Sequence, residues 1–148
     1  MSNEFNKELP IAIGSDHAGF QYKEKIKQYL AQKGWSVEDK GTFSEESTDY
    51  PDYAHPVAAM VEDGKAAAGI LICGSGNGVC MTANKHKGVR AALCWNEELA
   101  SLARQHNNAN VLCMPERFVD YNTAQNMTEL FITTAFEGGR HERRVEKI

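Results

Sequence analysis

The segment ILICGSGNGVCMTANK, residues 70–85, places the thiol of Cys73 directly before a glycine-rich loop. Backbone N–H groups in a loop that opens a helix bind an anion, or an oxyanion that forms during a reaction. A helix N-terminus and a nearby cation both favour a thiolate, and the ordinary thiol pKa of ~8.5 can fall towards neutrality there. The segment therefore predicts a reactive thiol beside an oxyanion hole. The structural alternative is a buried cysteine at a strand end.

The same loop does not fit the common nucleotide motifs. A Walker A loop requires a lysine and a Ser or Thr after its last glycine, and GSGNGVC has no lysine there. The dinucleotide fingerprint fails too, because the third glycine comes one residue early. A nucleotide is disfavoured, which leaves an anion-binding loop or a plain tight turn between strand and helix.

Two other short segments carry polar side chains that suit acid–base or binding chemistry. Asp16 and His17 follow the apolar run at 11–13, and His106 and Asn107 precede the apolar run at 111–113. His106 could be the cation beside Cys73 or an independent acid–base group. The alternatives are helix caps: an N-cap for Asp16, and for His106 a position at the negative end of a helix dipole.

The C-terminal stretch EGGRHERRVEKI, residues 137–148, is rich in cations. Arg140 and Arg144 are four positions apart, so on a helical turn they share one face and can clamp a phosphate. The alternative is a solvated terminus.

Composition limits the classes of protein that fit. The chain has 148 residues, 42% of them hydrophobic, which predicts one domain over 1–148 with an N-terminal tail at 1–8. A net charge of −4 without a basic stripe disfavours nucleic acid as a partner. With neither a signal peptide nor a run of ~20 apolar residues, we expect no membrane association and a cytoplasmic location. The cysteines lack C-x-x-C spacing, so they indicate neither a zinc site nor disulfides.

Short β-rich runs alternate with amphipathic segments along the whole chain. A stripe of apolar residues from Tyr22 to Leu30 marks a helix that ends near Gly34. Further helices are expected at 56–63, 97–106 and 121–136. Strands are expected at 10–13, 35–38, 69–72, 89–94 and 110–113. This alternation predicts an α/β fold, a three-layer Rossmann-like sandwich with a five-stranded parallel sheet and helices on both faces.

Ligands of such sheets bind beyond the carboxyl ends of the strands. We therefore expect the segments that carry Asp16, Cys73 and His106 to converge on one edge of the sheet.

Six short motifs occur in one order: IGSDHAGF, TDYPDYA, ILICGSGNG, ANK, RQHNNANVL and EGGRHERRV. Together they closely resemble the ribose-5-phosphate isomerase B family, over residues 11–145. The related isomerases of galactose 6-phosphate and allose 6-phosphate share much of this pattern. The resemblance implies interconversion of ribose 5-phosphate and ribulose 5-phosphate in the pentose phosphate pathway, without a metal or a cofactor.

The resemblance also implies a role for individual residues. Cys73 matches the base that moves a proton between C2 and C1, and His106 matches the group that opens the furanose ring. Asp16 and Asn107 match contacts to the sugar. The loop that matches the oxyanion hole comprises Gly74, Ser75, Gly76, Asn77 and Gly78, with Ser75 at the family's Ser/Thr position. The residues that match phosphate ligands are His17, Arg117, Arg140 and Arg144.

In this family the active site is shared across a homodimer, and Arg117 is expected to come from the second subunit. Whether dimers pair into tetramers stays open, as does the preferred sugar. Two other classes compete with an isomerase. A non-catalytic sensor of sugar phosphates would not need Cys73, and a thiol hydrolase or transferase would use Cys73 as a nucleophile.

Overall fold

The computed structural model describes residues 4–148, and its centre is a five-stranded sheet in which every pairing is parallel. The strands are β1 (Ile11–Ser15), β2 (Val37–Asp39), β3 (Ala68–Cys73), β4 (Ala91–Leu93) and β5 (Val111–Pro115). Their order across the sheet is β2-β1-β3-β5-β4. The strand that follows β1 in the chain, β2, lies on one side of it, and the next strand, β3, lies on the other side. The carboxyl ends of β1 and β3 thus form a topological switch point, where such sheets bind ligands.

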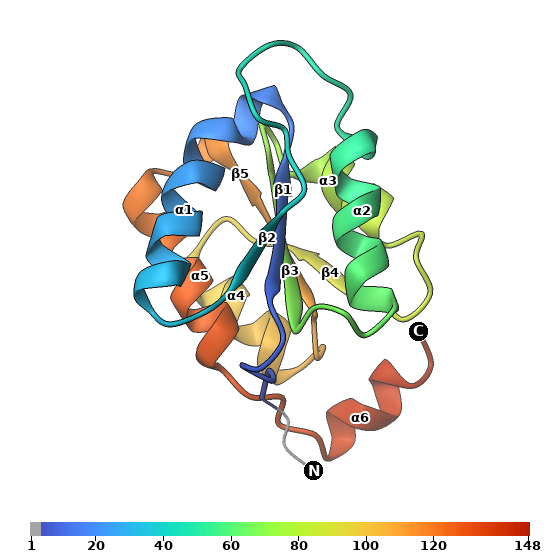
Figure 1. The fold of residues 1–148 in the computed structure, drawn as a ribbon. Coiled ribbons are helices and arrows are strands. Elements are labelled where there is room, and N and C mark those ends of the chain that lie inside the picture. Colours follow the sequence, from blue (N-terminus) through green and yellow to red (C-terminus); the bar gives the residue numbers. More distant parts are fainter. Residues whose placement is uncertain (1–3) are drawn as a thin grey trace.

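Helices cover both faces of this sheet, as Figure 1 shows. One face carries α1 (Phe20–Gln32), α4 (Glu97–Gln105) and α5 (Tyr121–Thr133). The other carries α2 (Pro51–Glu62) and α3 (Asn77–Ala83). The predicted three-layer α/β sandwich is confirmed.

The sequence builds these two faces by simple alternation along the strands. Ile70 and Ile72 point into the core with α1 and α5, whereas Leu71 and Cys73 point into the core with α2 and α3. This is the period of two of an extended chain, here with apolar residues at both positions because both faces are covered. The Cys73 side chain therefore points towards α2 and α3 because of its position in this alternation.

The helix boundaries differ from the prediction at two prolines and one helix end. The helix expected at 56–63 begins at Pro51, and Pro56 lies inside it. Pro51 suits the first turn, where no backbone N–H is needed, whereas Pro56 is tolerated within the helix against its usual preference. The last long helix ends at Thr133 rather than at residue 136, because Thr134 turns to an extended conformation.

A short helix, α6 (Arg140–Val145), lies apart from the sandwich at the amino-terminal edge of the sheet (Figure 1). Two glycines with positive φ, Gly138 at 69° and Gly139 at 58°, turn the chain into it. Among residues 4–148, no helix has the length and apolar character needed to cross a membrane.

Candidate active site

Cys73 ends β3 and begins the glycine loop. Its side chain is almost fully buried, with 5% of the residue exposed. The loop turns at Gly76, which has a φ of 75° and packs so closely that a Cβ there would lie 2.5 Å from Leu93 Cδ1. Only glycine fits this turn. The turn leads directly into α3 and keeps the loop backbone around the Cys73 sulfur.

The environment of this thiol is mixed. Burial raises the pKa of Cys73, and the negative charge of Asp16 raises it further. Hydrogen bonds from the backbone N–H groups of Val79, Gly76 and Ser75 oppose this and lower the pKa. The net direction is upward, so within one chain the pKa of Cys73 lies above the ordinary thiol value and does not fall towards neutrality. The cation that was expected to lower this pKa, His106, does not lie beside the thiol.

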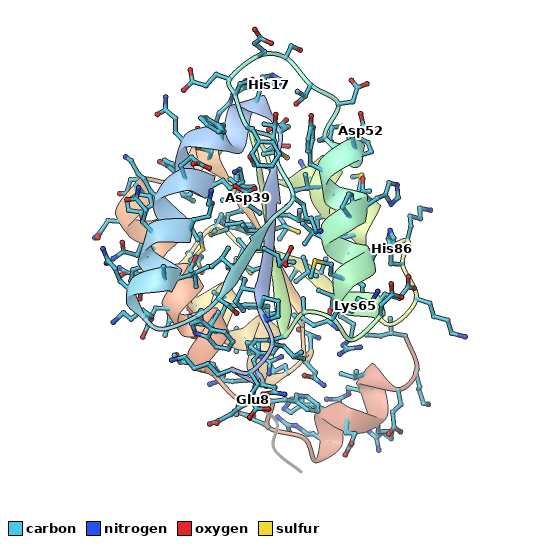
Figure 2. All side chains as sticks on the ribbon, in the orientation of Figure 1. Glu8, His17, Asp39, Asp52, Lys65 and His86 are labelled. Atoms are coloured by element: carbon cyan, nitrogen blue, oxygen red, sulfur yellow. The ribbon has the colours of Figure 1, made fainter. Side chains whose placement is uncertain are left out.

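Asp16 and His17 meet Cys73 at the switch point between β1 and β3. Asp16 Oδ1 accepts the backbone N–H groups of Ala18 at 3.0 Å and Gly19 at 3.1 Å, so the expected N-cap is present, on a short 3-10 helix (His17–Gly19). Nδ1 of His17 accepts the backbone N–H of Thr48 at 3.2 Å. In the neutral ring, this bond leaves Nε2–H as the donor. Figure 2 shows His17 at this end of the sheet.

A hollow of about 440 Å³ contains these groups. Its lining residues are Asp16, His17, Ala18, Tyr50, Cys73, Gly74, Ser75, Gly78, Arg117 and Phe118. Tyr50 and Phe118 were missed by the sequence reasoning, although Tyr50 lies within the TDYPDYA motif. Gly76 is buried beneath the loop, and Asn77 lines an adjacent hollow of about 360 Å³ with Trp95.

Arg117 lies at the Cys73 hollow of its own chain, so the expectation that a second subunit supplies it is wrong. A Cβ placed on Gly74 would lie 3.2 Å from Arg117 Nη1, and the Arg117 backbone N–H donates to Gly74 O at 3.1 Å. The reason is strand order. β5 pairs directly with β3, with Cys73 opposite Pro115, so a residue two positions beyond β5 falls over the glycine loop.

His106 and Asn107 lie at the opposite edge of the sheet, which corrects the expectation of one convergent edge. They line a second hollow of about 510 Å³ with Arg140, Arg144 and His141. These two residues precede β5, and the start of a parallel strand lies at the amino-terminal edge. The five residues of β5 alone separate the two ends by roughly 16 Å.

The predicted site residues are therefore divided between two hollows of the chain. The first holds a thiol, a carboxylate and loop N–H groups; the second holds two histidines and two arginines. Arg140 and Arg144 share the helix α6, as predicted. His141, which lies between these arginines in the sequence, was not among the predicted site residues. Its ring stacks on that of His106, with centroids 4.2 Å apart.

Comparison with known proteins identifies the family. The family model described as Ribose/Galactose Isomerase matches residues 11–148. The chain is 46% identical to ribose-5-phosphate isomerase B of Escherichia coli (strain K12), over 93% of each protein. It is also similar to the crystal structure of a ribose 5-phosphate isomerase from Thermotoga maritima, with 52% identity, a TM-score of 0.91 and coverage of 94% and 96% of the two chains.

A third relative has been solved with a ligand. Ribose-5-phosphate isomerase B from Mycoplasma genitalium with bound ribulose-5-phosphate superimposes with a TM-score of 0.92, at 47% identity, and the match covers 96% of this chain and 95% of that one. The match to the family model and the extent of these identities lead to one conclusion: the chain belongs to the ribose/galactose isomerase family.

Proposed function

We propose that this protein interconverts ribose 5-phosphate and ribulose 5-phosphate, with Cys73 as the base. The observation that carries the proposal is the buried Cys73 thiol within a loop whose backbone N–H groups point at the sulfur. Relatives named ribose-5-phosphate isomerase B, one of them solved with bound ribulose-5-phosphate, support it.

The reaction moves one proton between neighbouring carbons. The Cys73 thiolate takes the proton from C2 of the open-chain aldose, and the C1 carbonyl oxygen becomes the oxyanion of an enediolate. Backbone N–H groups of residues 74–78, with the hydroxyl of Ser75, stabilise that charge. The thiol then returns the proton to C1 as O2 becomes the ketone oxygen and the hydroxyl proton of O2 passes to O1. The overall balance requires neither oxidant nor reductant.

Ring opening precedes this transfer and needs a group that moves the proton of the C1 hydroxyl to the ring oxygen. We assign this role to His106 of a second copy, because the His106 end of one chain lies far from its own Cys73. In that arrangement Asp16 of the first copy and Asn107 of the second contact the sugar hydroxyls.

The phosphate of the substrate is a dianion and needs several cations or donors. His17 and Arg117 provide them beside Cys73, and Arg140 and Arg144 provide them from the segment 137–148 of the second copy. Two exposed apolar side chains adjoin the Cys73 hollow, Trp95 at 55% and Phe118 at 74% exposure. The Cys73 hollow lacks the residues that we assign to a second copy, and exposed aromatic side chains beside it are suited to contact that copy. We therefore propose a homodimer with shared sites.

The substrate assay separates the competing functions. We expect the purified protein to convert ribose 5-phosphate to ribulose 5-phosphate after exhaustive treatment with EDTA, with lower kcat/KM on allose 6-phosphate and galactose 6-phosphate. Ketose formation is followed spectrophotometrically. A higher kcat/KM on either six-carbon sugar would reassign the substrate. Binding of these sugars without turnover would favour a sensor, and an acyl-enzyme trapped on Cys73 would favour a thiol hydrolase.

The charge of Asp16 beside Cys73 predicts how the pH dependence of kcat/KM moves when that charge is removed. The thiolate is the active form, so kcat/KM rises with pH until the pKa of the thiol is reached. Asp16→Asn removes a negative charge that raises this pKa, so the rising limb moves to lower pH, by up to about one pH unit.

The shift is measured as the pH dependence of kcat/KM and, without substrate, as the pH dependence of Cys73 alkylation followed by mass spectrometry. The alkylation readout is needed because Asp16 is also assigned to sugar binding. Glu8→Gln is the matched control, since Figure 2 shows Glu8 at the opposite end of the molecule. If the rising limb of Asp16→Asn stayed in place or moved to higher pH, Asp16 would not be raising the pKa of the Cys73 thiol.

A further inference from the structure

His106, Glu137 and His141 form a compact cluster of ligand-type side chains at the amino-terminal edge of the sheet. Glu137 Oε1 lies 3.9 Å from His106 Nε2 and 3.6 Å from His141 Nε2. One ligand atom from each residue lies within 4.8 Å of the others. Neither Glu137 nor His141 has a part in the proposed chemistry.

The donor set matches zinc chemistry. Two imidazole nitrogens and one carboxylate oxygen bind Zn²⁺ at about 2.0–2.2 Å, which places ligand atoms roughly 3.3 Å apart in a tetrahedral site. The two pairs that involve Glu137 therefore need to close by only about half an ångström. The histidine rings are nearly parallel, at 12°, so one ring must tilt. The His106 side chain is 40% exposed and has the space to do so.

The backbone holds the three residues together before any ion arrives. The Glu137 N–H donates to Gln105 O at 3.1 Å, which fixes the Glu137 segment to the end of α4, next to His106. The His141 N–H donates to Gly138 O at 3.1 Å, which closes the turn between Glu137 and His141. The cluster is thus preorganised by main-chain contacts from two segments that are distant in sequence.

Arg140 and Arg144 line the same hollow as the two histidines and repel a cation, and the one carboxylate of Glu137 offsets them only in part. We therefore expect weaker binding than at a structural zinc site.

We propose that His106, Glu137 and His141 form a site for a divalent transition metal of the Zn²⁺ class, and that its occupation inhibits the enzyme. Three protein ligands leave the fourth position for water. The metal would take the Nε2 lone pair of His106, the group assigned to ring opening. The inhibitory effect rests on the proposed function; the metal binding does not.

Calorimetric titration of the metal-free protein with ZnCl₂ tests the binding. We expect one ion per chain, with affinity reduced at least about tenfold by Glu137→Gln and by His141→Asn. Glu137 is half exposed, so its substitution by the isosteric amide leaves the fold intact. Two controls should keep wild-type affinity. His86→Asn removes a different histidine, which lies beside His55 and Glu62 next to α2 (Figure 2), and Cys73→Ala removes the thiol as an alternative ligand.

Initial rates with ribose 5-phosphate test the inhibition. Wild-type activity should fall over the Zn²⁺ range that saturates the site and recover with EDTA, and Glu137→Gln should shift this range by the same factor as the affinity. Affinity that is unchanged in Glu137→Gln and His141→Asn, or lost in His86→Asn or Cys73→Ala, would overturn the site. Saturation of the site without inhibition would overturn the inhibitory role. Zinc binding at these three residues in a protein that lacks isomerase activity would support the site and refute the proposed function.

Discussion

Cys73→Ala is expected to lower kcat for ribose 5-phosphate by about 10²–10⁴-fold and to change KM little. A general base acts in the transition state, whereas the phosphate and hydroxyl contacts that hold the substrate are assigned to other side chains. Loss of an interaction made only in the transition state lowers kcat and kcat/KM together. Steady-state kinetics of the purified variant measure both.

The control for this experiment is Cys80→Ala. Cys80 lies on α3, one turn beyond the loop, does not line the Cys73 hollow, and donates a weak hydrogen bond to Ala91 O. Both substitutions remove one sulfur from the same face of the sheet, so thermal unfolding should show a comparable small loss of stability. Turnover near that of wild type in Cys73→Ala would show that Cys73 is a buried strand-end residue and not the base.

The fold followed from local patterns. Apart from β2, the strands are short and almost wholly apolar, and the long helices have one apolar stripe each. The alternation of the two specifies a parallel sheet covered on both faces. The helix expected at 56–63 begins at Pro51, and a proline suits the first turn of a helix at either position. Sequence alone does not decide between two such prolines.

The candidate site was only half predictable. Asp16 follows β1 and Cys73 ends β3, and these two strands are neighbours, so their meeting was correctly expected. His106 precedes a strand, and the general rule of parallel sheets places it at the other edge; the expectation of one convergent edge overlooked the direction of β5. The position of Arg117 could be predicted only from the strand order, because the pairing of β5 with β3 brings this residue to the glycine loop. A single sequence does not reveal that order.

The separation of the two hollows makes a quantitative prediction about mixtures. In a dimer with shared sites, each site takes Cys73 from one copy and His106 from the other. Mixing Cys73→Ala with His106→Ala in equal amounts makes half of the dimers hybrid, and each hybrid has one intact site of two. About a quarter of the wild-type activity should therefore return, although each variant alone is inactive.

A second mixture provides the matched control. Wild type exchanged with a chain that carries both substitutions places one defect in each site of every hybrid dimer, so only wild-type dimers remain active. Shared sites then predict about a quarter of the activity of the same total amount of wild type. Sites contained within one chain predict about half.

The most direct test of the account is the isomerase activity of these two mixtures, measured on ribose 5-phosphate after subunit exchange has been verified by native mass spectrometry. The account predicts that both mixtures reach the same level, about a quarter of wild type. No activity in the first mixture, together with about half in the second, would show that Cys73 and His106 serve a site within one chain and would contradict it.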